Sequence, residues 1–271
     1  MIELDHLSYS SISTWQMCGA SWKFRYIDKP AGLTSTALVF GSAFHNAVEN
    51  FLAHQVEGSE KVSLLDSWHE AWKNESTRLD PETDERKPRE DVNWDLETPE
   101  SLCNEGVRIL GHPDIQQGIL SIKPLIRADF SPAIETKIEL KVPGVPIPII
   151  GYIDIISADC VPGDFKTSSR SWSADKAEDE IQTLFYLAAL NQAGFEVKDW
   201  RFRHYIFVKT KTPQFQVFEH RHNPTQLMWL FKMIGEVWRA IEAGVYPPNP
   251  GSWKCSPKYC EYWALCRGKY G

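Results

Sequence analysis

The sequence predicts an α/β fold, with a mixed central sheet flanked by helices. The first observation is a set of apolar segments between about residues 134 and 221 that alternate with period two, as strands do. The second is helical periodicity on both sides of this stretch, at about 41–55, 62–79 and 225–243. The third is the composition of the 271 residues, 42% hydrophobic and 24% charged, which is typical of globular proteins.

The N-terminal half is predicted to be mainly helical. Ser10, Ser11 and Ser13 can cap a helix that ends near residue 28. A second helix runs from about Gly41 to Gln55, and residues 62–79 and 99–110 form two more, with a polar loop between them. We therefore expect one domain over residues 1–271, with a helical insertion at about 55–125 and a cysteine-containing C-terminal segment at 245–271.

The chain is organised around two predicted strands, Ile149–Ser157 and Val161–Thr167, each with one carboxylate. Alternate side chains of a strand share a face, so Asp164 and Lys166 point the same way and Phe165 points the opposite way. A hairpin brings Asp154 beside Asp164. Buried carboxylates repel each other unless a proton or cation lies between them, and this predicts a divalent metal. The alternative is that both aspartates are ordinary turn residues.

Two helices carry further candidate residues. The helix predicted at about 175–193 holds Gln182 and Tyr186, which are four residues apart and share a face. The helix at 41–55 places His45 beside the apolar stripe, with Glu49 one turn further on. His45 is interpreted as a metal ligand, and the alternative is a structural histidine in the core.

Four motifs in this order resemble those of RecB-like nucleases of the PD-(D/E)XK superfamily, the branch that contains the RecB and AddB nuclease domains and the CRISPR-adaptation exonucleases. The motifs are GSAFH with His45, GYID with Asp154, DFK with Asp164 and Lys166, and QTLFY with Gln182 and Tyr186. The resemblance extends over most of the chain outside roughly residues 55–125. It implies a restriction-endonuclease-like fold with a helical insertion.

The resemblance also implies roles for these residues. His45, Asp154, Asp164 and the carbonyl of Phe165 would bind Mg2+ or Mn2+, and Lys166 would position the attacking water and stabilise developing charge. Gln182 and Tyr186 would orient the helix end and contact DNA. Glu135, at the start of the preceding strand, is either an accessory acid or a salt-bridged surface residue. The implied activity is a metal-dependent deoxyribonuclease, more an exonuclease than an endonuclease, acting on single-stranded or end-resected DNA in recombination, repair or replication.

Six cysteines are present, and three of them lie in the last stretch: Cys255, Cys260 and Cys266. Clustered cysteines indicate a metal rather than a disulfide in the expected cytoplasmic location, and a fourth ligand is needed. The resemblance implies a [4Fe-4S] cluster with Cys18 as that ligand, while Cys103 and Cys160 stay outside it. The four-residue gap between Cys255 and Cys260 departs from the expected two. Zinc, or free thiols, are therefore the alternatives.

Charge and hydropathy narrow the class of protein. The net charge of -7 argues against a protein that coats nucleic acid nonspecifically, although a local basic groove or bound cations can still hold phosphate. The sequence contains no apolar run long enough for a membrane span and no secretory signal pattern, so a membrane is not an expected partner. The expected partner is DNA with a free end, and the sequence identifies no helicase or recombination partner. The alternatives to an enzyme are a catalytically silent, nuclease-like DNA-binding or assembly subunit, and a protein that zinc stabilises and that carries out no chemistry on DNA.

Overall fold

A five-stranded mixed sheet lies at the centre of the computed structural model, which describes residues 4–30, 34–58, 62–80, 82–94 and 97–270. The strands follow one another in the order β5-β6-β7-β8-β9, and only β7 and β8 are parallel. Their bounds are Ile134–Leu140, Ile149–Ile156, Pro162–Ser168, Arg201–Val208 and Gln214–Arg221. This arrangement confirms the predicted α/β class.

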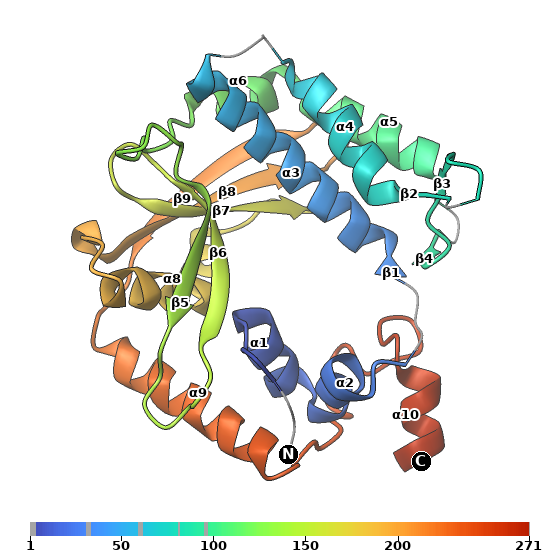
Figure 1. Ribbon diagram of the computed structural model, residues 1–271, viewed down its shortest axis with the longest axis vertical. Coiled ribbons are helices and arrows are strands. Elements are labelled where there is room, and N and C mark those ends of the chain that lie inside the picture. Colours follow the sequence, from blue (N-terminus) through green and yellow to red (C-terminus); the bar gives the residue numbers. More distant parts are fainter. Residues whose placement is uncertain (1–3, 31–33, 59–61, 81, 95–96, 271) are drawn as a thin grey trace.

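Helices cover both faces of this sheet (Figure 1). On one face lie α3 (Thr36–Glu57), α4 (Leu64–Ser76), α5 (Pro99–Leu110) and α6 (Pro113–Ser121), whose core includes Phe44, Trp68 and Phe207. On the other lie α1 (Tyr9–Met17), α8 (Ile181–Gln192) and α9 (Gln226–Glu242), whose core includes Phe185 and Phe202. Strand β8 thus places Phe202 and Phe207 in different cores, as alternation along a strand requires.

Short elements complete the fold. The polar loop expected between the helices at 62–79 and 99–110 contains β3 (Arg86–Pro88) and β4 (Val92–Asn93), which pairs with β1 (Thr34–Ser35). The last residues of the helix predicted at 62–79 form β2 (Thr77–Leu79) instead, which pairs with β3. The Asp80 carboxylate accepts the backbone N–H groups of Glu82 and Thr83 and stabilises the turn between β2 and β3. The remaining elements are α2 (Gly19–Lys23), a π-helical turn (Phe24–Asp28), α7 (Ala174–Glu178), a 3-10 turn (Lys198–Trp200) and α10 (Trp263–Tyr270).

The single N-terminal helix predicted up to residue 28 is wrong, because the helix breaks at Cys18. Cys18 has extended backbone angles, φ -168° and ψ 111°, between α1 and α2. The following Gly19 lies against the C-terminal segment, so closely that a Cβ on Gly19 would stand 2.9 Å from Pro247. The backbone N–H of Asn249 also contacts Cys18 Sγ at 3.4 Å. The break therefore occurs where the two ends of the chain meet.

The helix predicted at 175–193 is also two helices, α7 and α8, separated at Asp179 and Glu180. The Thr183 hydroxyl donates to the carbonyl of Glu180, which satisfies one backbone acceptor at the break. Helix α8 consequently begins at Ile181, and Gln182 lies in its first turn. Helix α3 begins earlier than expected, because Ser35 caps it by accepting the N–H of Leu38. No helix in the described ranges is both long and apolar enough to span a bilayer.

Candidate active site

The candidate site lies where β6 and β7 separate. The two strands pair only through Ile155 with Gly163 and Ile156 with Pro162, next to their turn. Beyond these pairs the backbone hydrogen bonds between β6 and β7 end. The Asp154 carboxylate takes their place, because its Oδ2 accepts the N–H of Phe165 at 2.6 Å. Asp154 and Asp164 are 7% and 3% exposed. Two buried carboxylates therefore lie on neighbouring strands at an opening in the sheet.

Helix α3 brings two more ligand-type side chains to this opening. His45 Nδ1 lies 3.7 Å from Asp154 Oδ2, and the imidazole packs edge-on against Phe165. Glu49 follows one turn later on the same helix face. One potential ligand atom from each of His45, Glu49 and Asp154 lies within 4.8 Å of the others. A nitrogen and two carboxylate oxygens this close together form a donor set suited to a divalent cation.

The pKa values of these groups show how burial and neighbouring carboxylates shift their protonation. Burial, together with the charges of Asp154 and Glu135, raises the pKa of Glu49 to about 9. Burial and the neighbouring Asp164 also raise the pKa of Asp154. Burial lowers the pKa of His45 to about 4, which leaves the imidazole neutral and able to act as a ligand. Glu49 Oε1 is buried without a hydrogen-bond partner among the described residues. A bound cation would replace the proton on Glu49 and satisfy this oxygen.

A chain of polar contacts positions Lys166 on the other side of the carboxylates. Its Nζ lies 2.8 Å from Asp164 Oδ2 and donates to Gln182 Oε1 at 3.1 Å. Gln182 Nε2 in turn donates to the hydroxyl of Tyr186 at 2.6 Å. Burial alone would lower the pKa of Lys166, but the charges of Asp164 and Asp154 outweigh it and the pKa is raised. Lys166 is thus a fixed ammonium beside the carboxylates, held by the first turns of α8.

A family model described as the PD-(D/E)XK nuclease superfamily matches residues 6–267. The chain belongs to the PD-(D/E)XK nuclease superfamily. This membership supports a hydrolytic nuclease with DNA as its substrate, and nucleases of the superfamily use divalent metals.

One solved structure agrees with the fold of this nuclease-superfamily chain, and a second is similar over most of its length. A crystal structure from Eubacterium rectale, described as a "Putative exonuclease", has 12% identity and a TM-score of 0.56, and the match covers 98% of this chain and 89% of that one. The crystal structure described as SSO0001 has 12% identity and a TM-score of 0.37, with 97% and 96% covered. None of the curated proteins compared with the chain matches it significantly.

Two acidic residues of the site were not among the predicted ligands. The signal for Glu49 was its spacing of four from His45 on a predicted helix. Glu135, for which an accessory role and a surface role were both open, is exposed but hydrogen bonds to Glu49. Its φ of 45° is unusual for a non-glycine residue in a strand, and the register of β5 and β6 places it opposite Asp154. No sequence pattern predicts this local backbone conformation.

The four terminal cysteines of the nuclease lie around one cavity of about 210 Å³, although 237 residues separate Cys18 from Cys255. Cys255, Cys260 and Cys266 line it with Cys18, while Cys103 and Cys160 do not. Burial, and in addition the other cysteines, raise the pKa of Cys260 and of Cys266. In the described part of the chain, no three of these sulfur atoms lie within 4.8 Å of one another.

Proposed function

We propose that this protein is a Mg2+- or Mn2+-dependent deoxyribonuclease, with its active site at the opening between β6 and β7. The observation that carries the proposal is the convergence of His45, Glu49 and Asp154 within 4.8 Å, next to the Lys166–Asp164 pair. A purely structural role does not explain why the fold buries these carboxylates together, since burying like charges costs stability.

The residues fit a divalent cation. His45, Asp154, Asp164 and the carbonyl of Phe165 would hold it, and Glu49 would join them through its unpartnered Oε1. When bound, the cation supplies Lewis acidity, which lowers the pKa of a water molecule and neutralises phosphate charge. The Phe165 N–H fixes the orientation of the Asp154 carboxylate toward this site.

Lys166 contributes a positive charge that Asp164 holds beside the expected position of the phosphate. It would stabilise the negative charge that develops on the phosphoryl oxygens and orient the attacking water. Gln182 accepts from Lys166 and donates to Tyr186, so these two residues position the ammonium. Gln182 lies in the first turn of α8 and the buried Tyr186 one turn further on, and they would also contact the DNA strand.

The finer part of the proposal is exonuclease action on single-stranded or end-resected DNA in recombination, repair or replication. It is supported by the RecB-like motifs and by the description of the Eubacterium rectale protein as a "Putative exonuclease". A catalytically silent, DNA-binding subunit is the alternative. The full set of His45, Asp154, Asp164 and Lys166 around one opening favours an enzyme, since a silent site has no need to keep each of them.

We further propose a [4Fe-4S] cluster at Cys18, Cys255, Cys260 and Cys266. Four thiols around one cavity fit a metal group, and tetrahedral zinc with bonds of about 2.3 Å would require sulfur atoms roughly 3.8 Å apart. What favours a cluster over zinc is the resemblance to RecB-like nucleases, which have one cysteine near the N-terminus and three near the C-terminus, as this chain does. When bound, the cluster would tie the N-terminal helices to the C-terminal segment. Anaerobically purified protein should be brown and contain iron and sulfide; colourless protein with stoichiometric zinc would replace this assignment.

The activity is tested by incubating purified protein with end-labelled single- and double-stranded DNA in Mn2+, Mg2+ or EDTA. We expect metal-dependent release of short products from linear single strands, and no degradation of circular single strands. Asp164→Ala should abolish cleavage, whereas Asp129→Ala, which removes an exposed aspartate, should not. DNA binding without cleavage under every metal condition would instead support the silent subunit.

A further inference from the structure

The C-terminal segment from Trp253 to Tyr270 exposes several large aromatic side chains. Trp253 is 66% exposed, Tyr259 53% and Tyr270 44%. The segment carries four basic residues and one acidic residue, Glu261, in a chain with a net charge of -7. The basic residues are Lys254, Lys258, Arg267 and Lys269. Both its apolar exposure and its charge therefore differ from those of the chain as a whole.

Two of these aromatic rings form a unit with two lysines, which we call the Trp253–Tyr259 surface: Trp253, Lys254, Lys258 and Tyr259. The ring centroids are 5.7 Å apart at an interplanar angle of 67°. Lys254 Nζ lies 5.9 Å from the Trp253 centroid, and Lys258 Nζ lies 5.1 Å from that of Tyr259. Neither lysine has a carboxylate within ion-pair distance in the described part of the chain. Each exposed ring thus has an ammonium beside it that is not neutralised by an acid.

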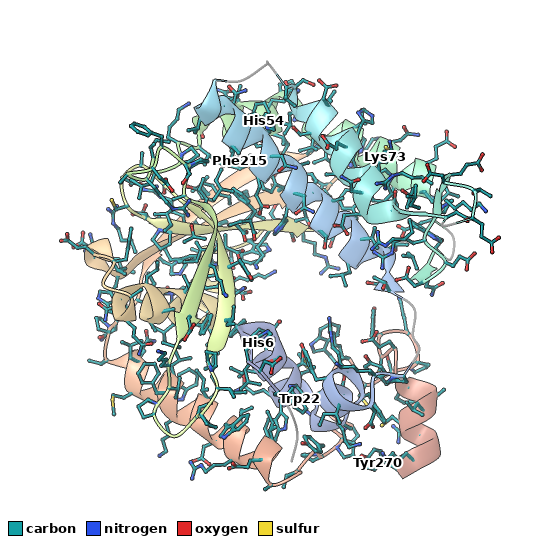
Figure 2. The ribbon with its side chains drawn as sticks, in the orientation of Figure 1. His6, Trp22, His54, Lys73, Phe215 and Tyr270 are labelled. Atoms are coloured by element: carbon teal, nitrogen blue, oxygen red, sulfur yellow. The ribbon has the colours of Figure 1, made fainter. Side chains whose placement is uncertain are left out.

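Neighbouring contacts hold this surface in place. Cys255 and Cys260, which line the cysteine cavity, flank Lys258 and Tyr259 in the sequence. Ser252 Oγ contacts Met17 Sδ at 3.0 Å, and the Asn249 side chain donates to the carbonyl of Met17. The two ends of the chain therefore support the segment, and Figure 2 shows Trp22 and Tyr270 in the same lower part of the molecule. A segment whose backbone is anchored in this way loses less conformational entropy on binding than a free one.

We propose that the Trp253–Tyr259 surface binds single-stranded DNA, with unpaired bases stacked on the two rings and phosphates beside the two lysines. Alternation of aromatic and basic residues matches the alternation of base and phosphate along a single strand. Charge complementarity favours this occupant, because the surface is basic in an acidic chain and DNA is a polyanion. This inference rests on the proposed function and adds a place, outside the cleavage site, where the substrate strand is held.

The test measures binding rather than cleavage. The probe is a fluorescein-labelled oligothymidylate of about 20 nucleotides, and its binding is followed by anisotropy. It is titrated with protein that retains the metal of the cysteine site, in buffer without added divalent ions. Trp253→Ala/Tyr259→Ala should raise Kd about 10-fold or more, since each lost base stack weakens binding several-fold. Trp229→Ala removes a ring on α9 that is 52% exposed and should change Kd less than about twofold.

The lysines provide a second measurement that does not depend on the rings. Lys254→Ala/Lys258→Ala should reduce the slope of log Kd against log salt by roughly 1.4, at about 0.7 for each lost phosphate contact with a single strand. Lys232→Ala, an exposed lysine on α9, is the matched control and should leave the slope unchanged. If the aromatic double variant loses its metal or its circular-dichroism spectrum, the lysine variant decides the question.

Unchanged Kd in the aromatic variant and unchanged slope in the lysine variant would overturn the proposal. An equal loss of affinity for a blunt duplex would also overturn it, because paired bases cannot stack on these rings. Absence of cleavage by the wild-type protein would count against the proposed nuclease activity alone, since the binding result does not depend on cleavage. The two proposals therefore fail in distinguishable ways.

Discussion

Replacement of Glu49 by glutamine should stabilise the metal-free protein while it weakens metal binding. Glu49 is 6% exposed and its pKa is raised to about 9, first by burial and then by Asp154 and Glu135. At neutral pH the metal-free side chain is therefore protonated and hydrogen bonds to Glu135. A glutamine amide has nearly the same shape and can donate to the same carboxylate, so Glu49→Gln resembles the protonated state without the need to take up a proton.

The magnitude follows from the difference between the folded and unfolded pKa values. A carboxyl with a raised pKa in the fold costs stability above its unfolded pKa of about 4.3, and this cost grows by about 1.4 kcal/mol per pH unit until the folded pKa is reached. Near pH 7, which is about 2.7 units above 4.3, the upper limit of the cost is roughly 4 kcal/mol. In a chain of this length that corresponds to an increase in melting temperature of several degrees, about 5–10 °C, for Glu49→Gln.

The assay is thermal unfolding of wild type and Glu49→Gln between about pH 4.5 and 8 in divalent-free buffer, repeated with Mn2+. The difference in stability should vanish near pH 4.5 and grow toward pH 8. Mn2+ should raise the melting temperature of the wild type more than that of Glu49→Gln. Glu139→Gln, which changes a carboxylate on β5 that is 46% exposed, is the control and should show neither effect. Lower stability of Glu49→Gln than wild type at pH 7 without metal would refute this reasoning.

Three further predictions address other parts of the molecule. Lys166→Ala should reduce cleavage of end-labelled single-stranded DNA by at least about 100-fold with an unchanged far-ultraviolet circular-dichroism spectrum, because the proposed charge stabiliser, a half-buried ammonium, is lost; near wild-type rates would contradict this role. Cys260→Ser should lower metal content, yield and melting temperature, and unchanged metal content measured by elemental analysis would exclude Cys260 as a ligand. His204 is 1% exposed and burial lowers its pKa to about 4, so the unfolded state takes up its proton first and the wild type should lose stability as the pH falls below about 6.5. His204→Phe should reduce the loss between pH 6.5 and 5 by roughly 2 kcal/mol in urea unfolding, whereas His69→Phe, at an exposed position, should not.

The local sequence pattern was sufficient to predict the strands and helices that carry the candidate site residues. Alternation along β7 predicted that Phe165 would point away from Asp164 and Lys166, and Phe165 is fully buried among side chains of the α3 face while Lys166 contacts Asp164. The helix predicted at 99–110 is α5, and its start is explained by Pro99 in the first turn and by Thr98 as the cap. These features depend on neighbouring residues in the sequence, so the sequence is enough to predict them.

The features that could not be predicted depend on distant parts of the chain. The break at Cys18 arises because Gly19 meets Pro247, a contact between the two ends of the sequence. The contact between Glu49 on α3 and Glu135 on β5 involves a residue with a left-handed φ of 45°, Glu135 itself. The roles of the site residues proposed from the motifs remain predictions that the cleavage experiments test.

The opening between β6 and β7 shows how the fold can satisfy its backbone hydrogen bonds and still leave space for the proposed cation. β6 and β7 share two residue pairs, whereas β8 and β9 share eight, so the ladder ends where the carboxylates begin. An unpaired buried N–H would destabilise this end, and Asp154 removes that cost by accepting the N–H of Phe165. The same hydrogen bond fixes the carboxylate that faces His45. Asp154 therefore acts as a substitute for strand pairing and is at the same time the proposed ligand, and a longer β6–β7 ladder would close the space that the proposed cation needs.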